Sequence, residues 1–218
     1  MADLRHANHM LLQQKYCAGI RNGDEMLLSN LKFIFRGNKL MKAGLILLMT
    51  ISAVLMLATT GYAHESATYS ATAIMKDVKG NTVGMATFTE EANGPVHINI
   101  NVRGLKPGLH GIHIHNTGKC IGPSFTSAGE HYNPLGKEHG LNNPKGPHAG
   151  DLPNLKVGKD GTGHMNVTTD RVTLSPGPNT LFTANGTSLV IHADPDDQMT
   201  NPTGNSGARI ACGVIKKK

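Results

Sequence analysis

Three histidines fall within six residues in the stretch GLHGIHIHNTGKC, residues 108–120. Two of them, His113 and His115, are separated by one isoleucine, so in a β-strand both side chains project from the same face. Ile112 and Ile114 would then face the other way, into a core. Imidazole nitrogens are common ligands of zinc and copper. A pair alone is equally compatible with a polar strand face, so the metal interpretation depends on further ligands.

Further candidate ligands occur in the segment 116–162 and in the stretch SLVIHA. Three imidazoles and a carboxylate suit tetrahedral zinc, and four protein ligands close such a site, which makes it structural. A nitrogen-only set suits copper among the redox metals. The sequence therefore predicts two sets of ligands, His131, His139, His148 and Asp151 for zinc, and His113, His115 and His192 for copper.

The segments that must position these residues alternate apolar and polar side chains with a period of two, which indicates β-strands. These runs lie at residues 67–77, 81–91, 96–105, 164–174, 188–193 and 208–215. We therefore predict an all-β fold, a Greek-key barrel or sandwich of about eight antiparallel strands. Two long segments, 116–162 and 193–208, interrupt the pattern. Because long loops in compact domains are usually functional or disordered, we expect two functional loops.

The first third of the chain has a different composition. From Met41 the sequence has a lysine, an apolar run over residues 43–58 and small residues up to Ala63, which is typical of a signal peptide cleaved after Ala63. A transmembrane anchor is the alternative, but the run is shorter than the ~20 residues that a bilayer needs. We expect an exported protein, located outside the cell, in the periplasm or at the envelope. The predicted organisation is an uncertain extension at 1–40, a signal peptide at 41–63 and one domain at 64–218. The extension is either an upstream segment included because the start codon was assigned too early or an unusually long charged leader.

The charge of the expected domain gives no reason to invoke nucleic acid. The whole chain carries a net charge of +6, but the part from His64 onward has 14 basic and 12 acidic residues, a net charge of +2. A basic run with interleaved aromatics is absent from this part of the sequence, and we expect the KKK tail, residues 216–218, to be a solvated terminus. We therefore predict no nucleic-acid partner.

Cys120 and Cys212 are the two cysteines of the expected domain. An even pair in an exported chain predicts one disulfide. It would close a loop of about ninety residues and stabilise the fold by ~4 kcal/mol in the chain-entropy description. Two buried free thiols are the alternative.

Several motifs together resemble those of one family. GIHIH, TSAGEHYNPLGKEHG, HAGDL, VIHADPDD and GNSGARIACGVI are similar to motifs of secreted, bacterial-type copper/zinc superoxide dismutases, and the resemblance extends over residues 66–215. It implies dismutation of superoxide to dioxygen and hydrogen peroxide, with one copper and one zinc per subunit, which would protect the cell exterior. It also implies copper ligands His113, His115, His131 and His192, zinc ligands His131, His139, His148 and Asp151, and an imidazolate of His131 that bridges both metals.

The resemblance also implies roles around the metals. Asp196 would link His113 to His139 by hydrogen bonds and so fix both rings. Arg209 would be the permanently cationic group that holds a small anion beside copper. His131 would carry one of the two protons of the reaction, and Cys120 and Cys212 would form the intrasubunit disulfide. His110 is expected to have a structural hydrogen-bonding role, and no motif supports a function for His64, His97 or His164.

The sequence departs from the animal members of the family in two places. Pro202 occupies the position of a lysine that attracts substrate, so attraction would have to come from elsewhere, for example from Lys137 or Lys145. Cys120 lies closer to the HIH motif, as in bacterial members, so the animal dimer interface is not transferable. We expect a monomer or a homodimer without a stable protein partner.

Two alternatives to the enzyme remain at this point. A non-catalytic protein of the same fold could store or deliver copper and zinc. A structural or adhesion β-sandwich is the second alternative, but it gives no reason for Asp196 and Arg209 to be present. All seven ligand positions and Arg209 are filled, which favours the enzyme.

Overall fold

The computed structural model describes residues 68–92 and 94–218, and the expected extension and signal peptide lie outside them. The described part contains ten strands and one short 3-10 turn. They are β1 (Tyr69–Asp77), β2 (Thr82–Glu90), β3 (Val96–Val102), β4 (Gly108–His110), β5 (Ile112–His115), η1 (Thr126–Ala128), β6 (Leu155–Val157), β7 (Gly163–Thr169), β8 (Ser188–His192), β9 (Arg209–Val214) and β10 (Lys216–Lys217). Within these residues no helix has the length and apolar character needed to cross a membrane.

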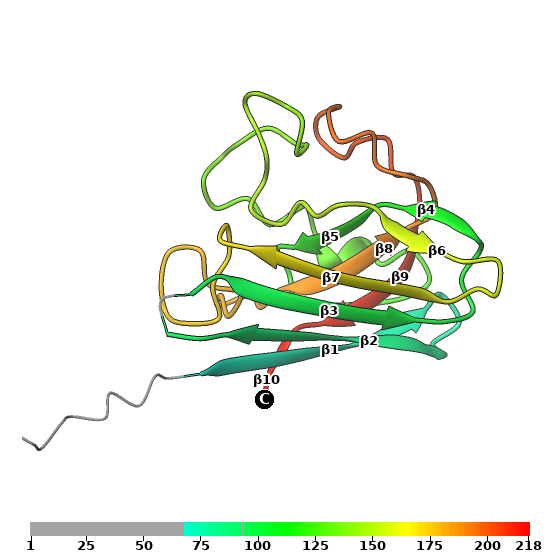
Figure 1. Cartoon of the computed structure of the whole chain (residues 1–218), viewed down its shortest axis with the longest axis horizontal. Helices are drawn as coiled ribbons and strands as arrows, with labels where there is room; N and C mark the ends of the chain where they lie inside the picture. The colour runs from blue at the N-terminus through cyan, green and yellow to red at the C-terminus, as the bar shows by residue number, and fades with distance from the viewer. Residues whose placement is uncertain (1–67, 93) are drawn as a thin grey trace, which may run out of the picture. The chain divides into compact units, whose positions relative to one another are not determined.

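The strands form one antiparallel sheet in the order β4-β6-β7-β3-β2-β1-β9-β8-β5, and β10 pairs with β1. The edge strands β4 and β5 are joined through Gly111 alone, so the sheet curls into a nearly closed barrel. The connections β3–β4 and β7–β8 join strands that are not neighbours, as a Greek-key arrangement requires. The predicted all-β fold is confirmed. In Figure 1 the segments before β6 and before β9 rise side by side above the part of the barrel wall formed by β5 and β4.

The period of two along the strands divides the barrel wall into an inner and an outer face. Burial of the inner side chains is the main stabilising contribution to such a fold. The inner face includes Ala71, Ala73 and Met75 of β1, Ala86 and Phe88 of β2, Val96, Ile98 and Ile100 of β3, Ile112 and Ile114 of β5, and Leu189 and Ile191 of β8.

Three sequence predictions need correction. The segment 116–162 is not one irregular loop, because β6 pairs with β4 and β7 within it. The strand expected over 164–174 ends at Thr169, because the buried carboxylate of Glu90 draws the following chain away by accepting hydrogen bonds from Ser175 N (2.8 Å) and from Leu174 N. The KKK tail is not a free terminus, since β10 hydrogen-bonds along β1.

Candidate metal centre

The free edge of β5 is covered by two segments of the long loop, and this pairing brings candidate ligands together. The amide of Tyr132 donates to the carbonyl of Ile114 (2.8 Å), and the amide of Ile114 donates to the carbonyl of Gly150 (2.9 Å). A Cβ at Gly150 would collide with the Ile114 carbonyl oxygen, so the close approach requires glycine. The pairing places His131 beside β5 from one segment and Asp151 from the other.

Four buried histidines each have one ring nitrogen without a hydrogen-bond partner. A buried polar group left unpaired costs ~1–3 kcal/mol, so four such atoms in one place indicate a shared ligand. The four residues can offer ring nitrogens within 4.8 Å of one another, and a nitrogen-only set fits copper. The unpartnered atoms are Nδ1 of His113 and Nε2 of His115, His131 and His192.

The second nitrogen of three of these rings donates a hydrogen bond to a fixed acceptor. His113 Nε2 donates to Asp196 Oδ2 (2.7 Å), and His115 Nδ1 donates to the Gly129 carbonyl (2.9 Å). His192 Nδ1 donates to the main-chain carbonyl of Gly207 (3.2 Å). A proton held on this side leaves the opposite nitrogen with a free lone pair, which is the form that binds a metal.

A second set of donor atoms surrounds Asp151. Its Oδ1 lies 3.0 Å from Nδ1 of both His131 and His139 and 3.3 Å from Nδ1 of His148. The Nδ1 atoms of His148 and His131 are 3.4 Å apart. Zinc–ligand bonds of ~2.0–2.1 Å separate tetrahedral ligands by about 3.4 Å, so the four donors fit a zinc ion.

His113 also lies within reach of this second set. Its Nε2 is occupied by Asp196, however, and its Nδ1 belongs to the unpartnered group described above. His148 is therefore the better fourth member, as the sequence predicted. His131 belongs to both sets through its two nitrogens, which residue spacing alone did not indicate.

Asp196 connects the two sets. Its Oδ2 accepts from His113 and its Oδ1 accepts from His139 Nε2 (3.0 Å). Asn154 fixes Asp196 in turn, since the amide N of Asp196 donates to Asn154 Oδ1 (2.8 Å). The link that the resemblance implied is therefore present as geometry.

Burial keeps the imidazoles of His131 and His192 neutral. Burial lowers the pKa of His131 to about 4 in spite of its hydrogen bond to Asp151. Burial and the nearby His113 ring lower the pKa of His192 to about 3. Both rings are uncharged at neutral pH, so one nitrogen of each can bind a metal without releasing a proton. Binding at both nitrogens of His131 would release its remaining ring proton.

His139 behaves differently because it lies between two carboxylates. Burial alone would lower its pKa, but the hydrogen bonds to Asp151 and Asp196 outweigh burial and raise the pKa to about 9. Burial would raise the pKa of each carboxyl, yet the imidazole hydrogen bonds hold both well below the usual range. Asp151 and Asp196 are therefore ionised and available as ligand and orienting group.

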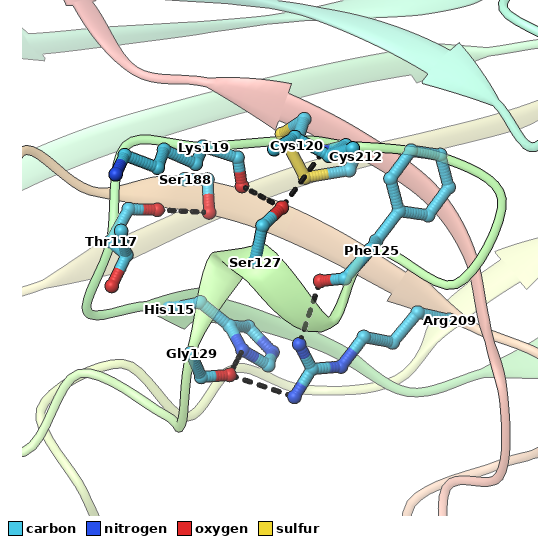
Figure 2. Close-up of a disulfide and its surroundings, with 11 residues drawn as sticks. His115, Thr117, Lys119, Cys120, Phe125, Ser127, Gly129, Ser188, Arg209 and Cys212 are labelled. Atoms are coloured by element: carbon cyan, nitrogen blue, oxygen red, sulfur yellow. Dashed lines mark hydrogen bonds between the residues drawn. A yellow bond between two sulfur atoms is a disulfide. The ribbon is translucent and has the colours of Figure 1, made fainter.

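Arg209 is held beside the first set by two main-chain carbonyls. Nη1 donates to Phe125 O (2.8 Å) and Nη2 donates to Gly129 O (2.7 Å). The Gly129 oxygen is the same acceptor that His115 uses, as Figure 2 shows. The Gly129 carbonyl therefore holds the guanidinium of Arg209 close to the imidazole of His115.

The loop that carries these carbonyls is tied to β9 by the disulfide between Cys120 and Cys212, with a Cα–Cα distance of 5.6 Å. Ser127 braces the loop internally, since its Oγ accepts from Ile121 N (2.8 Å) and donates to Lys119 O (3.3 Å) (Figure 2). The predicted disulfide is confirmed, and it anchors the segment on which Arg209 rests.

A cavity of about 520 Å³ lies beside the histidine cluster. It is lined by His131, Glu130, Lys137 and Pro202, among others. Lys145 is not among its lining residues and forms an ion pair with Glu138 (3.3 Å). Of the two lysines proposed to attract an anion, only Lys137 reaches this cavity.

The sequence matches the family described as "Copper/zinc superoxide dismutase (SODC)" over residues 82–215. The chain belongs to this family. It is 47% identical over 142 residues to superoxide dismutase [Cu-Zn] 2 of Aquifex aeolicus, covering 64% of this chain and 82% of the relative. It is 44% identical over 139 residues to superoxide dismutase-like protein YojM of Bacillus subtilis, covering 63% of this chain and 71% of the relative.

Solved structures of the family show the same fold. A superoxide dismutase-like protein of Bacillus subtilis superimposes with a TM-score of 0.63 at 41% identity, covering 66% of this chain and 96% of that chain. A double mutant of that protein, in which a tyrosine and a proline are replaced by histidine, gives a TM-score of 0.63 at 43% identity. The match covers 66% of this chain and 95% of that chain.

The remaining histidines of the barrel contribute no donor atom to either set. His110 is buried, and its two nitrogens lie 2.7 Å from the carbonyls of His192 and Lys106, in line with the structural role expected. His97 and His164 are exposed, and His64 lies outside the described residues. The sequence analysis missed the main-chain acceptors of Phe125, Gly129 and Gly207, because a carbonyl leaves no signal in residue type.

Proposed function

We propose that the chain catalyses the dismutation of superoxide to dioxygen and hydrogen peroxide at a copper/zinc pair bridged by His131. The observation that carries the proposal is the set of four buried, unpartnered imidazole nitrogens with Arg209 fixed beside it. The copper would be held by His113, His115, His131 and His192, and the zinc by His131, His139, His148 and Asp151.

In this proposal the protein side chains position the substrate and supply a proton. The bound copper would supply the one-electron chemistry, and the zinc would hold the loop and the bridging ring. Arg209 would attract the superoxide anion and compensate its charge. His131, whose Nε2 has no other hydrogen-bond partner, would hold and deliver a proton to the reduced substrate.

A non-catalytic copper- and zinc-binding protein is the second candidate. The name of the Bacillus subtilis relative, superoxide dismutase-like, keeps it open. Two observations support the enzyme over this candidate. All seven proposed ligands converge, His148 through its contacts with Asp151 and His131. The guanidinium of Arg209 has defined hydrogen bonds, although metal storage alone would not need it.

The deciding experiment compares residues 64–218, loaded with both metals, with the His113→Ala and Arg209→Ala variants. We expect fast dismutation by the parent, none above free copper for His113→Ala, and a rate lowered by about 10²-fold for Arg209→Ala, the effect of losing one preorganised charged donor. Metal analysis of each protein checks that the parent holds one copper and one zinc. A parent that holds both metals but is no faster than free copper would support the binding protein instead.

We also propose that the domain is exported after cleavage near Ala63. The support is the lysine, apolar run and small residues of 41–63. Mass spectrometry of the protein recovered from cells that express the full chain tests this proposal. A mature species starting at His64 outside the cytoplasm supports export, and an uncleaved species in the cytoplasm contradicts it.

A further inference from the structure

Exposed apolar side chains gather around the disulfide on the outer face of β1. Ile74 and Met85 are direct cross-strand partners, 48% and 44% exposed. Ile74 lines a surface pocket of about 230 Å³ together with both cysteines of the disulfide. Ile121 follows Cys120 in the chain and is 66% exposed. Val78 is 42% exposed, and its carbonyl oxygen lies against Gly122, the residue after Ile121. We call Ile74, Val78, Met85 and Ile121 the β1 patch.

The β1 patch contains four of the seven large apolar side chains that are exposed in the part of the chain the structure describes. The inner side of β1 is already used by the core, so the patch has no packing role within the barrel. Exposed apolar side chains gathered in one region are typical of interaction sites in soluble proteins.

Two lysines lie directly at the β1 patch. Lys76 and Lys216 line the same pocket as Ile74. The main chain that carries Lys216 is fixed in place, because β10 pairs with β1 and the amide of Lys218 donates to Ser70 O (3.0 Å). The carboxylate of Asp77, the neighbour of Lys76 in the chain, accepts hydrogen bonds from the amides of Lys79 and Asn81 and leaves a net positive charge on the lysines around it. Lys79 and Lys119 follow and precede patch-side residues in the chain, Val78 and Cys120. We call Lys76, Lys79, Lys119 and Lys216 the basic rim of the patch.

We propose that the β1 patch docks the barrel on the surface of an anionic lipid bilayer. Apolar side chains enter the boundary between headgroups and acyl chains, and a basic rim is attracted to anionic headgroups. A second copy fits less well. A two-fold interface centred on Ile74 would bring Lys76 and Lys216 against lysines of the partner, and such like-charge contacts oppose association.

Docking in this way is compatible with access to the metal centre. The cavity beside His131 shares no lining residue with the pocket that contains Ile74 and the disulfide. An anion could therefore reach the histidine cluster while the β1 patch is covered. The inference does not depend on the catalytic activity of the cluster.

The test uses residues 64–218, because the apolar run 43–58 would bind membranes by itself. This part is expected to fold alone, since the solved relative matches it over 96% of the relative's own chain. Co-sedimentation is measured with vesicles of phosphatidylglycerol and phosphatidylcholine and with vesicles of phosphatidylcholine alone. We expect binding to the anionic vesicles that weakens with salt and almost no binding to the neutral ones.

Two double variants of the β1 patch are compared with matched controls elsewhere on the barrel. Lys76→Gln with Lys216→Gln should weaken binding by about twenty-five-fold, since each lysine near the surface contributes about five-fold. Ile74→Ser with Ile121→Ser should weaken it by about ten-fold or more. The first control, Lys156→Gln with Lys159→Gln, removes the same charge outside the patch. The second control, Leu109→Ser with Leu135→Ser, replaces exposed apolar side chains outside the patch. Both controls should bind like the parent.

Three results would overturn the proposal. The first is absence of binding to anionic vesicles by the folded parent protein. The second is equal weakening by the patch variants and their controls, which would indicate non-specific attraction. The third is a dimer in sedimentation velocity that the Ile74→Ser and Ile121→Ser changes dissociate, which would assign the β1 patch to a second copy of the chain.

Discussion

The main-chain carbonyl of Phe125 accepts a hydrogen bond of 2.8 Å from Nη1 of Arg209. Phe125 has a left-handed backbone (φ 54°), which a bulky residue rarely adopts and which is uphill by ~1–3 kcal/mol. Its ring is buried against Val190 and Cys212, and this packing offsets the strain. The ring therefore holds a strained carbonyl in the direction that Arg209 needs.

From this relationship we expect Phe125→Gly to lower the dismutation rate constant by about ten-fold, because glycine frees the carbonyl and misplaces the guanidinium. Phe125→Leu, which keeps an apolar side chain at the site, should retain most of the rate. Stopped-flow kinetics on metal-loaded protein measures both. In an Arg209→Gln background the Phe125→Gly change should add nothing, and an undiminished effect there would show that Phe125 acts by another route.

Asp196→Asn should lower the affinity for both metals by about 10- to 100-fold, because one carboxylate orients His113 and His139 together. The measurement is the copper and zinc retained after dialysis against a competing chelator. Asp197→Asn is the matched control, since the neighbouring carboxylate contacts main-chain amides and Asn205 but no histidine. Equal loss of metal from both variants would contradict the orienting role.

The relative placement of two candidate ligands was predictable because their geometry is local. In β5 a period of two aims His113 and His115 at the same side, and the cluster confirms that they lie together. The place of His131 in both sets was implied by resemblance only. Spacing alone could not give it, because it depends on main-chain pairing between β5 and a loop segment distant in sequence.

The tail was mispredicted for a similar physical reason. A KKK sequence has the composition of a solvated terminus, yet the main chain of Lys216 pairs with Thr72. Backbone hydrogen bonds are indifferent to side-chain type, and the lysine side chains stay exposed while the strand forms. Residue composition therefore predicted the exposure of the side chains but not the strand.

Lys137→Gln should lower the rate constant at low ionic strength by a few-fold and make it less sensitive to salt, because Lys137 lines the cavity beside His131. Lys145→Gln removes the same charge from a lysine that is paired with Glu138, so it serves as the control. Rates measured over a series of salt concentrations distinguish the two. If the rate constant falls equally in both variants, the net charge of the protein is responsible and Lys137 has no special position.

Asp197 gives the fold a defined acid dependence. Its carboxylate accepts from Thr200 N (2.8 Å) and Met199 N (2.9 Å). Hydrogen bonding by the Thr200 side chain, together with these main-chain hydrogen bonds, lowers the pKa of Asp197 from 3.8 to about 2. As the pH falls, the unfolded chain takes up this proton first. The stabilisation is therefore complete above about pH 4 and is lost as the pH falls toward 2.

Asp197→Asn has a side chain that is neutral at every pH. Above pH 4 we expect it to have a lower melting temperature than the parent, with the two melting temperatures converging near pH 2. Thermal unfolding followed by circular dichroism across this range measures the difference, and a gap that stays constant down to pH 2 would show that the charge of Asp197 does not stabilise the loop.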